Sequence, residues 1–181
     1  MKRSVWFSVL VSVLIVLFGI SEVVLADQSL EGKTARLYLI QQAWYSPESE
    51  MVLVVAHRGD WKDAPESSLL SIESCIAKGA DIVEIDVRMT KDGQFIVLHD
   101  DSLDRTTNGT GSVGASTLAE IRKLRLVHNG KVTDCQVPTL EEALLAIKGR
   151  IMVNLDIKTG PIREMVELCQ RLGVIDQVIF K

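Results

Sequence analysis

The stretch that decides the fold is residues 82–88, which read Ile82-Val83-Glu84-Ile85-Asp86-Val87-Arg88. In a strand successive side chains alternate between faces, so the three central apolar residues share one face while Glu84 and Asp86 share the other. The apolar face can pack on helices. Two neighbouring carboxylates on the inner face are costly to bury unless a cation lies between them. The stretch therefore predicts a buried strand that carries a functional site.

Strands and helices are predicted to alternate on both sides of this strand. The valine-rich run 51–56 is typical of a strand buried on both faces. Further strands are predicted over residues 95–99, 151–158 and 177–180. Helices are predicted from apolar spacing, capping signals and terminal glycines over residues 35–44, 67–78, 117–124, 139–147 and 162–172. This alternation favours an α/β fold with a parallel sheet and right-handed crossovers.

An open doubly wound sheet and a closed barrel both fit the alternation, and the polar residues decide between them. They lie at or near the carboxyl ends of different strands: His57, Glu84, Asp86, His99, Asp156 and Lys158. Catalytic groups at the ends of many strands are typical of the TIM-type (β/α)8 barrel. The glycine-rich phosphate loop that usually marks a doubly wound nucleotide site is absent from the sequence. Such a barrel needs eight strands and about 250 residues. Residues 51–181, with about five strands, are therefore expected to be its N-terminal part. In isolation the chain is expected to be insoluble, oligomeric or only partly folded, with little or no activity.

The composition and the N-terminus bound the remaining possibilities. The 181 residues are 47% apolar with a net charge of −4, which excludes a disordered chain, and no basic stripe indicates nucleic-acid binding. Lys2 and Arg3 precede an apolar run and small residues, a pattern that predicts a signal peptide over residues 1–26 and export to the periplasm or medium. An uncleaved membrane anchor is the alternative. Residues 27–50 are expected to cover one end of the domain.

The cysteines are three in number, which is odd for an exported protein. Cys75 and Cys169 fall within helical patterns and are interpreted as core residues, and their spacing does not suit a thiolate metal site. One disulfide is left open, because the sequence does not choose a pair.

Several short motifs occur in a fixed order, and together they resemble the glycerophosphodiester phosphodiesterase family. The motifs are His57-Arg58-Gly59, Pro65-Glu66, Glu84-Ile85-Asp86-Val87, Thr90-Lys91-Asp92-Gly93, Leu98-His99-Asp100, residues 103–111, residues 138–142 and Leu155-Asp156-Ile157-Lys158. Each motif alone is weak, but so many in order are specific. The resemblance covers about residues 52–181.

The resemblance implies metal-dependent hydrolysis of glycerophosphodiesters to glycerol 3-phosphate and an alcohol on a TIM-type barrel. It implies that the metal ligands are Glu84, Asp86 and Asp156. It implies an acid–base pair of His57 and His99, phosphate contacts from Arg58 and Lys158, and a further polar site residue, Glu66. A set of carboxylate oxygens suits Ca2+ or Mg2+ better than zinc, and histidine is well poised for proton transfer near neutral pH.

Alternatives remain open for both the site and the function. Glu84 and Asp86 could be neutralised by Arg58 and Lys158 without a metal, and a single histidine is more often structural than catalytic. The attacking group could be water or the adjacent glycerol hydroxyl. A lysophospholipase D-like or other phosphodiesterase, or a barrel-derived binding module without turnover, would carry many of the same residues. The sequence leaves the oligomeric state unknown.

Two departures from the family pattern bear on the site. Ser67-Ser68 stands where the family usually has Asn-Thr after Pro-Glu; serine can still cap a helix, but it reaches less far. Asp156 stands where the family usually has glutamate and is one methylene shorter. Neither departure removes a chemical group that the reaction needs.

Overall fold

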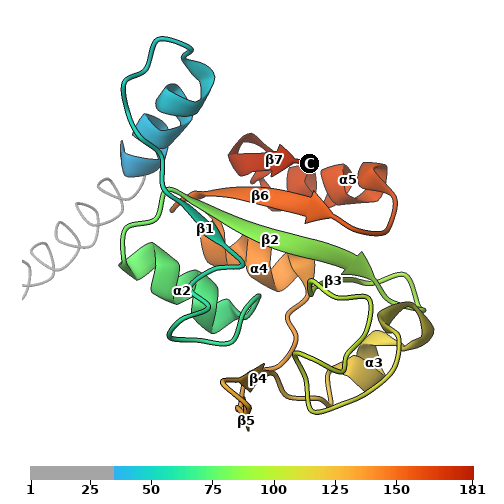
Figure 1. Ribbon diagram of the computed structural model, residues 1–181. Coiled ribbons are helices and arrows are strands. Elements are labelled where there is room, and N and C mark those ends of the chain that lie inside the picture. Colours follow the sequence, from blue (N-terminus) through green and yellow to red (C-terminus); the bar gives the residue numbers. More distant parts are fainter. Residues whose placement is uncertain (1–34) are drawn as a thin grey trace, which may run out of the picture.

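The computed structural model describes residues 35–181, whose centre is a five-stranded sheet (Figure 1). Four strands run parallel in the order β1-β2-β6-β7, with bounds Val55–His57, Ile82–Met89, Met152–Ile157 and Val178–Phe180. The fifth, β3 (Phe95–Val97), pairs antiparallel with the second half of β2. The predicted α/β architecture with a largely parallel sheet is confirmed.

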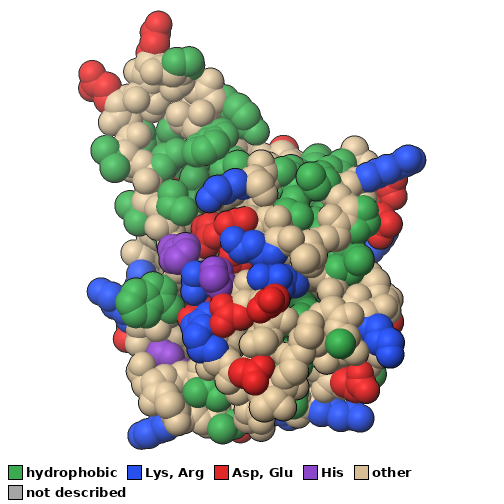
Figure 2. All heavy atoms as spheres, turned by 45° about the vertical axis from the view of Figure 1, so that its right-hand side comes forward, with side chains coloured by type: hydrophobic (Ala, Val, Ile, Leu, Met, Phe, Trp, Pro, Cys, Tyr) green, Lys and Arg blue, Asp and Glu red, His purple; other side chains and the backbone are tan. Residues whose placement is uncertain are grey.

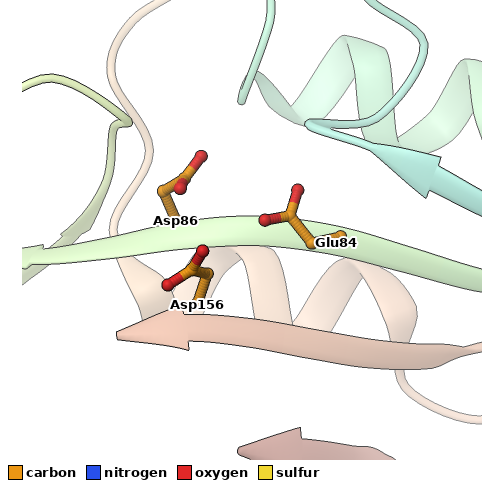
Figure 3. Close-up of side chains that lie close together, drawn as sticks. All are labelled: Glu84, Asp86 and Asp156. Carbon is orange, nitrogen blue, oxygen red and sulfur yellow. The ribbon is translucent and has the colours of Figure 1, made fainter. Parts of the chain in front are cut away.

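One face of this sheet is buried beneath helices α2 (Leu69–Ala77), α4 (Leu140–Ile147) and α5 (Ile162–Leu172). Val83, Ile85 and Val87 of β2 join apolar side chains of all three helices in one cluster, and Figure 1 shows α4 behind the sheet. The alternation predicted for β2 is therefore correct, and Glu84 and Asp86 project from the face opposite to these three helices (Figure 3).

The helices begin at or near the residues that the capping signals predict, but the helix predicted over residues 117–124 ends at Ile121. Thr139 caps α4 through a reciprocal capping box with Glu142, and Thr117 does the same with Glu120 for the short helix α3 (Leu118–Ile121). Helix α5 ends at Gly173, whose φ of 67° is a left-handed conformation that glycine adopts at low cost. Two 3-10 turns, η1 (Val113–Ala115) and η2 (Ile175–Gln177), complete the connections.

Three features of the strands differ from the sequence prediction. Strand β1 has only three residues, and the side chains of Val52 and Val54 are 84% and 56% exposed. The expectation of a strand buried on both faces is thus wrong for this run, because β1 pairs with β2 alone among the described residues. The predicted third strand is antiparallel, because the tight turn at Gly93 folds it directly back on β2. A small hairpin, β4 (Val127–His128) with β5 (Lys131–Val132), was not predicted.

Residues 35–45 form a helix, as predicted, in which Leu37 and Ile40 pack on Ile82 and Met152 at the beginnings of β2 and β6. None of the helices within residues 35–181 is long and apolar enough to cross a membrane. The predicted signal peptide, residues 1–26, lies outside the described residues.

All three cysteines are free thiols, so no disulfide forms among the described residues. Cys75 and Cys169 are buried in the main core, as predicted, and burial raises the pKa of each thiol to about 11. At neutral pH both are protonated and behave as small apolar residues.

Candidate active site

Three carboxylates from two adjacent strands meet on the open face of the sheet (Figure 3). Glu84 and Asp86 lie two residues apart on β2, and Asp156 of β6 pairs in register with Asp86. Oxygen atoms of all three lie within 4.8 Å of one another, although Asp156 is shorter than the glutamate usual in the resembled family. Glu84 and Asp86 are almost fully buried. Three acidic groups this close require cationic compensation.

Both predicted catalytic histidines reach the carboxylates along one edge of β2. Strand β6 occupies the other edge, so β1 pairs with the first part of this edge and β3 with its last part. His57 ends β1 opposite Glu84, with its Nε2 3.8 Å from Glu84 Oε2. His99 follows β3, immediately after Leu98, whose amide donates to the Asp86 carbonyl. The antiparallel course of β3 is what delivers the second histidine to the site.

His99 is held in one tautomer by the next residue in the chain. Its Nδ1 lies 2.7 Å from Asp100 Oδ1. Hydrogen bonds from Arg105 hold the pKa of Asp100 well below its usual range, so the carboxyl is ionised and can only accept. The Nδ1 atom is therefore the donor, which leaves a lone pair on Nε2 when the ring is neutral.

Lys158 and Arg58 supply the predicted cations. Lys158 Nζ lies 2.7 Å from Asp156 Oδ2 and 3.2 Å from Asp86 Oδ1. The hydrogen bond between Lys158 and Asp156 raises the pKa of the amine and lowers the pKa of the carboxyl, so both are charged at neutral pH. Arg58 Nε lies 3.6 Å from Asp86 Oδ2, and its backbone amide donates to Glu84 Oε2.

The pairing of these cations tests whether the carboxylates fit a metal ion. Buried Glu84 has no lysine or arginine partner among residues 35–181, and its ion-pairing neighbour is His57. Asp86 Oδ2 is buried and accepts no hydrogen bond from the described residues, although Arg58 Nε lies 3.6 Å away. The alternative of pairing by Lys158 and Arg58 alone thus leaves Glu84 without a lysine or arginine partner and this oxygen of Asp86 without a hydrogen bond. Hard oxygen ligands with residual negative charge fit a divalent cation such as Ca2+ or Mg2+.

A bridge of ion pairs connects the loop after β1 to the loop after β3. Glu66 accepts from Arg58 Nη1 at 3.1 Å and from both terminal nitrogens of Arg105 at 2.8 Å. Arg105 also donates to both oxygens of Asp100, at 2.6 and 3.0 Å. These contacts, chiefly with Arg105, lower the pKa of Glu66. The predicted site residue Glu66 therefore lies behind Arg58, joined through Arg105 to the partner of His99.

The backbone around Arg58 is strained where it turns into this loop. Arg58 has φ 57° and Ser67 has φ 59°, left-handed values that non-glycine residues adopt at a cost. Between them, Gly59 packs so tightly on α2 that a Cβ would lie 2.5 Å from Ser71 Oγ. Ser68, not Ser67, caps α2, and the buried Ser67 hydroxyl finds no hydrogen-bond partner in the described part of the chain. A strained loop is thus fixed beside the site.

The structure brings together all eight residues singled out from the sequence. Figure 2 shows acidic, basic and histidine side chains gathered in the middle of the face toward which the parallel strands point. Sequence reasoning missed the connecting residues, Asp100 and Arg105. Both lie in motifs that support the family resemblance, but nothing in their spacing shows that they bond to each other. The roles of the eight residues stay predictions.

A parallel sheet backed by helices, with polar groups at the carboxyl ends of its strands, defines a protein of the TIM-barrel class. The profile of the glycerophosphoryl diester phosphodiesterase family matches residues 57–177, two thirds of the chain. The chain belongs to this family.

Relatives and solved structures agree with this assignment. A glycerophosphodiester phosphodiesterase of Caldanaerobacter subterraneus is 43% identical over 111 residues, which are 60% of this chain and 46% of that protein. The crystal structure of a glycerophosphodiester phosphodiesterase from Agrobacterium tumefaciens superposes with a TM-score of 0.69 at 34% identity, over 72% of this chain and 58% of the other. An Oleispira antarctica phosphodiesterase in complex with the product sn-glycerol-3-phosphate gives 0.62 at 34% identity, over 67% of this chain and 53% of the other. The chain spans about half the length of these proteins.

Proposed function

We propose that the protein hydrolyses glycerophosphodiesters to glycerol 3-phosphate and an alcohol. The observation that carries the proposal is the convergence of Glu84, Asp86 and Asp156 within 4.8 Å, beside two histidines and two cations. Membership of the family supports the reaction class, and the product named for the Oleispira structure supports the substrate class. This arrangement supplies what phosphodiester hydrolysis requires, namely charge neutralisation at phosphorus and two proton-transfer groups.

The three carboxylates would hold one divalent cation, Ca2+ or Mg2+. When bound, such a cation neutralises charge on a phosphoryl oxygen and on the attacking oxygen. Lys158 and Arg58 flank the carboxylates and would contact the remaining phosphate oxygens. Arg58 suits this role because its guanidinium presents several donors in one plane, and Glu66 already fixes one of them.

The histidines would move the protons. His99 Nε2 carries the lone pair, because Nδ1 donates to Asp100, and so accepts the proton of the attacking hydroxyl or water. As the new oxygen–phosphorus bond forms, the bond to the alcohol oxygen breaks, and that oxygen takes a proton from His57. The His57 side chain is 64% exposed, which leaves it room to reach a leaving group at the mouth of the site. With water as the attacking group, His99 afterwards releases its proton to solvent and His57 regains one. With the glycerol hydroxyl as the attacking group, this step yields a cyclic phosphate. A water that gives its proton to His57 then opens the ring to glycerol 3-phosphate, while His99 returns its proton to the glycerol oxygen.

The test is release of glycerol 3-phosphate from sn-glycero-3-phosphoethanolamine by purified protein that carries the complete barrel, which is the wild type in all activity assays below, with H57Q and H99Q as comparison variants. We expect release by the wild type and loss of about 10²–10⁴-fold in each variant. Choline release from lysophosphatidylcholine, without activity on the glycerol diester, would indicate a lysophospholipase D-like enzyme instead. Binding of the diester without turnover would indicate a binding module.

Export through cleavage near Ala26, with membrane anchoring as the alternative, also stays a proposal. It follows from the sequence of residues 1–26 and can be checked by N-terminal sequencing of the protein recovered outside the cytoplasm.

A further inference from the structure

Arg88 lies on the same face of β2 as the two metal-ligand candidates, and the reaction proposed above does not use it. It follows Asp86 by two residues, so its side chain projects from the same face, about 7 Å further toward the carboxyl end of the strand. Its Nε donates to the backbone carbonyl of His99 at 2.9 Å. This bond fixes the guanidinium beside the candidate catalytic histidine.

The rest of the Arg88 guanidinium is available to a ligand. Arginine has five N–H donors, and within residues 35–181 the two terminal nitrogens of Arg88 have no hydrogen-bond or ion-pair partner. The side chain is half-buried, so its charge is less screened than that of a fully exposed arginine. A half-buried cation with free donors is suited to an anionic group.

Arg88 lines a hollow of about 390 Å³ that adjoins the site. Two of the lining residues directly follow site residues in the chain: Thr159 follows Lys158, and Asp101 follows Asp100. The remaining wall includes Lys91 and Ser112. The hollow meets the candidate active site at Arg88, whose Nε contacts the His99 carbonyl.

We propose that this hollow receives the alcohol half of the diester and favours alcohols that carry a carboxylate, with Arg88 as the residue that determines this specificity. The inference rests on the proposed function. Four single bonds separate phosphorus from the carboxylate carbon of a serine leaving group, so the span is at most about 6 Å at about 1.5 Å per bond. This span is comparable to the offset of Arg88 from Asp86.

The charges and side chains of the hollow support this choice over a quaternary ammonium group. Arg88 and Lys91 contribute two positive charges and Asp101 one negative charge, an arrangement that suits a carboxylate with an adjacent ammonium group. Cages for quaternary ammonium groups are built from aromatic side chains, and no aromatic residue lines this hollow. A glycerophosphoserine-type substrate fits these features better than a choline ester.

The decisive comparison uses two substrates that differ by one carboxylate, glycerophosphoserine and glycerophosphoethanolamine. Equilibrium binding is measured with their phosphonate analogues, in which a methylene replaces the oxygen to the alcohol so that no cleavage occurs. We expect the wild type to bind the serine analogue about tenfold or more tightly than the ethanolamine analogue, as one charge-assisted hydrogen-bonded pair provides. In R88Q this ratio should fall to about one. R163Q, which removes an 89% exposed arginine from α5, should keep the wild-type ratio.

Turnover of the two natural diesters separates this inference from the proposed function. A wild-type binding ratio near one, or a ratio that R88Q leaves unchanged, would overturn the assignment of Arg88 even if both diesters are hydrolysed. Equal losses of binding for both analogues in R88Q would also overturn it, since Arg88 would then act only through His99. Selective binding without hydrolysis would contradict the proposed function and leave the specificity of the hollow standing.

Discussion

Replacing Arg105 by glutamine would remove the ion-pair bridge that joins the loop after β1 to the loop after β3. In the wild type this side chain makes four charge-assisted hydrogen bonds, two to Glu66 and two to Asp100, at 2.6–3.0 Å. The arginine is about half exposed, so the two pairs stabilise the fold by only about 1 kcal/mol together. The effect on turnover should be larger, because displacement of a catalytic group by about 1 Å can cost about 10²-fold. We expect kcat to fall about 10–100-fold.

R105Q should also alter how the unfolding free energy depends on pH. Arg105 is the main reason that the pKa of Glu66 and the pKa of Asp100 lie below their ordinary values. Carboxyls with lowered folded-state pKa values stabilise the fold above about pH 4, and this stabilisation is lost as pH falls through the folded values. In R105Q the contribution is missing. The difference in unfolding free energy between variant and wild type should therefore be largest near neutral pH and should shrink below about pH 4.

The assay combines kinetics, urea unfolding at several pH values and nitrogen NMR of the His99 ring. The matched control is R122Q, because Arg122 makes a bidentate pair with Glu142 at 2.8 and 3.0 Å, outside the candidate site. We expect R122Q to lose stability without loss of kcat. In R105Q, Asp100 stays ionised but loses the two hydrogen bonds that orient it, so the Nδ1–H tautomer of the neutral His99 ring should become less dominant. A folded R105Q with kcat within twofold of the wild type and an unchanged tautomer would refute the positioning role.

Two further predictions concern the histidines and the loop before α2. In the double variant H57Q/H99Q, the fold-loss of turnover should be smaller than the product of the two single losses, because both residues serve one mechanism. Single-turnover rates measure these losses. A double loss equal to the product would count against a shared step. S67N should raise the unfolding free energy by about 0.5–1 kcal/mol, because asparagine tolerates the left-handed φ of 59° better than serine does. The measurement is the urea midpoint, which should rise. A lower midpoint for S67N would show that the buried hydroxyl site has no room for the amide.

Most of the fold could be predicted because local signals and global packing agree. The period-two pattern of β2 placed Val83, Ile85 and Val87 in the core, and the capping boxes at Thr117 and Thr139 marked the first residues of two helices. Glu84 and Asp86 stand out from the sequence because buried carboxylates on a strand are costly without a cation beside them. The roles of the other candidate residues are implied by the resemblance and stay predictions. Their convergence followed from the rule that parallel strands end at one edge of a sheet.

The remainder depends on pairing that no local pattern encodes. The run 51–56 is apolar enough for a central strand, yet exposed Val52 and Val54 show that hydrophobicity does not reveal how many neighbours a strand has. The tight turn at Gly93 makes β3 antiparallel once it pairs with β2, but no local pattern shows that β3 pairs with β2. The bridge through Arg105 spans 39 residues to Glu66, and such long-range ion pairs carry no sequence signature.

The measurement that tests the central claim most directly is glycerol 3-phosphate release before and after exhaustive chelation. The wild type should lose turnover on chelation while its circular-dichroism spectrum stays unchanged, and added Ca2+ or Mg2+ should restore the rate. D86N should need a higher cation concentration for half-maximal rate, because it removes the charge from the most buried of the three carboxylates. Undiminished turnover after chelation would contradict the assignment of Glu84, Asp86 and Asp156 to a metal site.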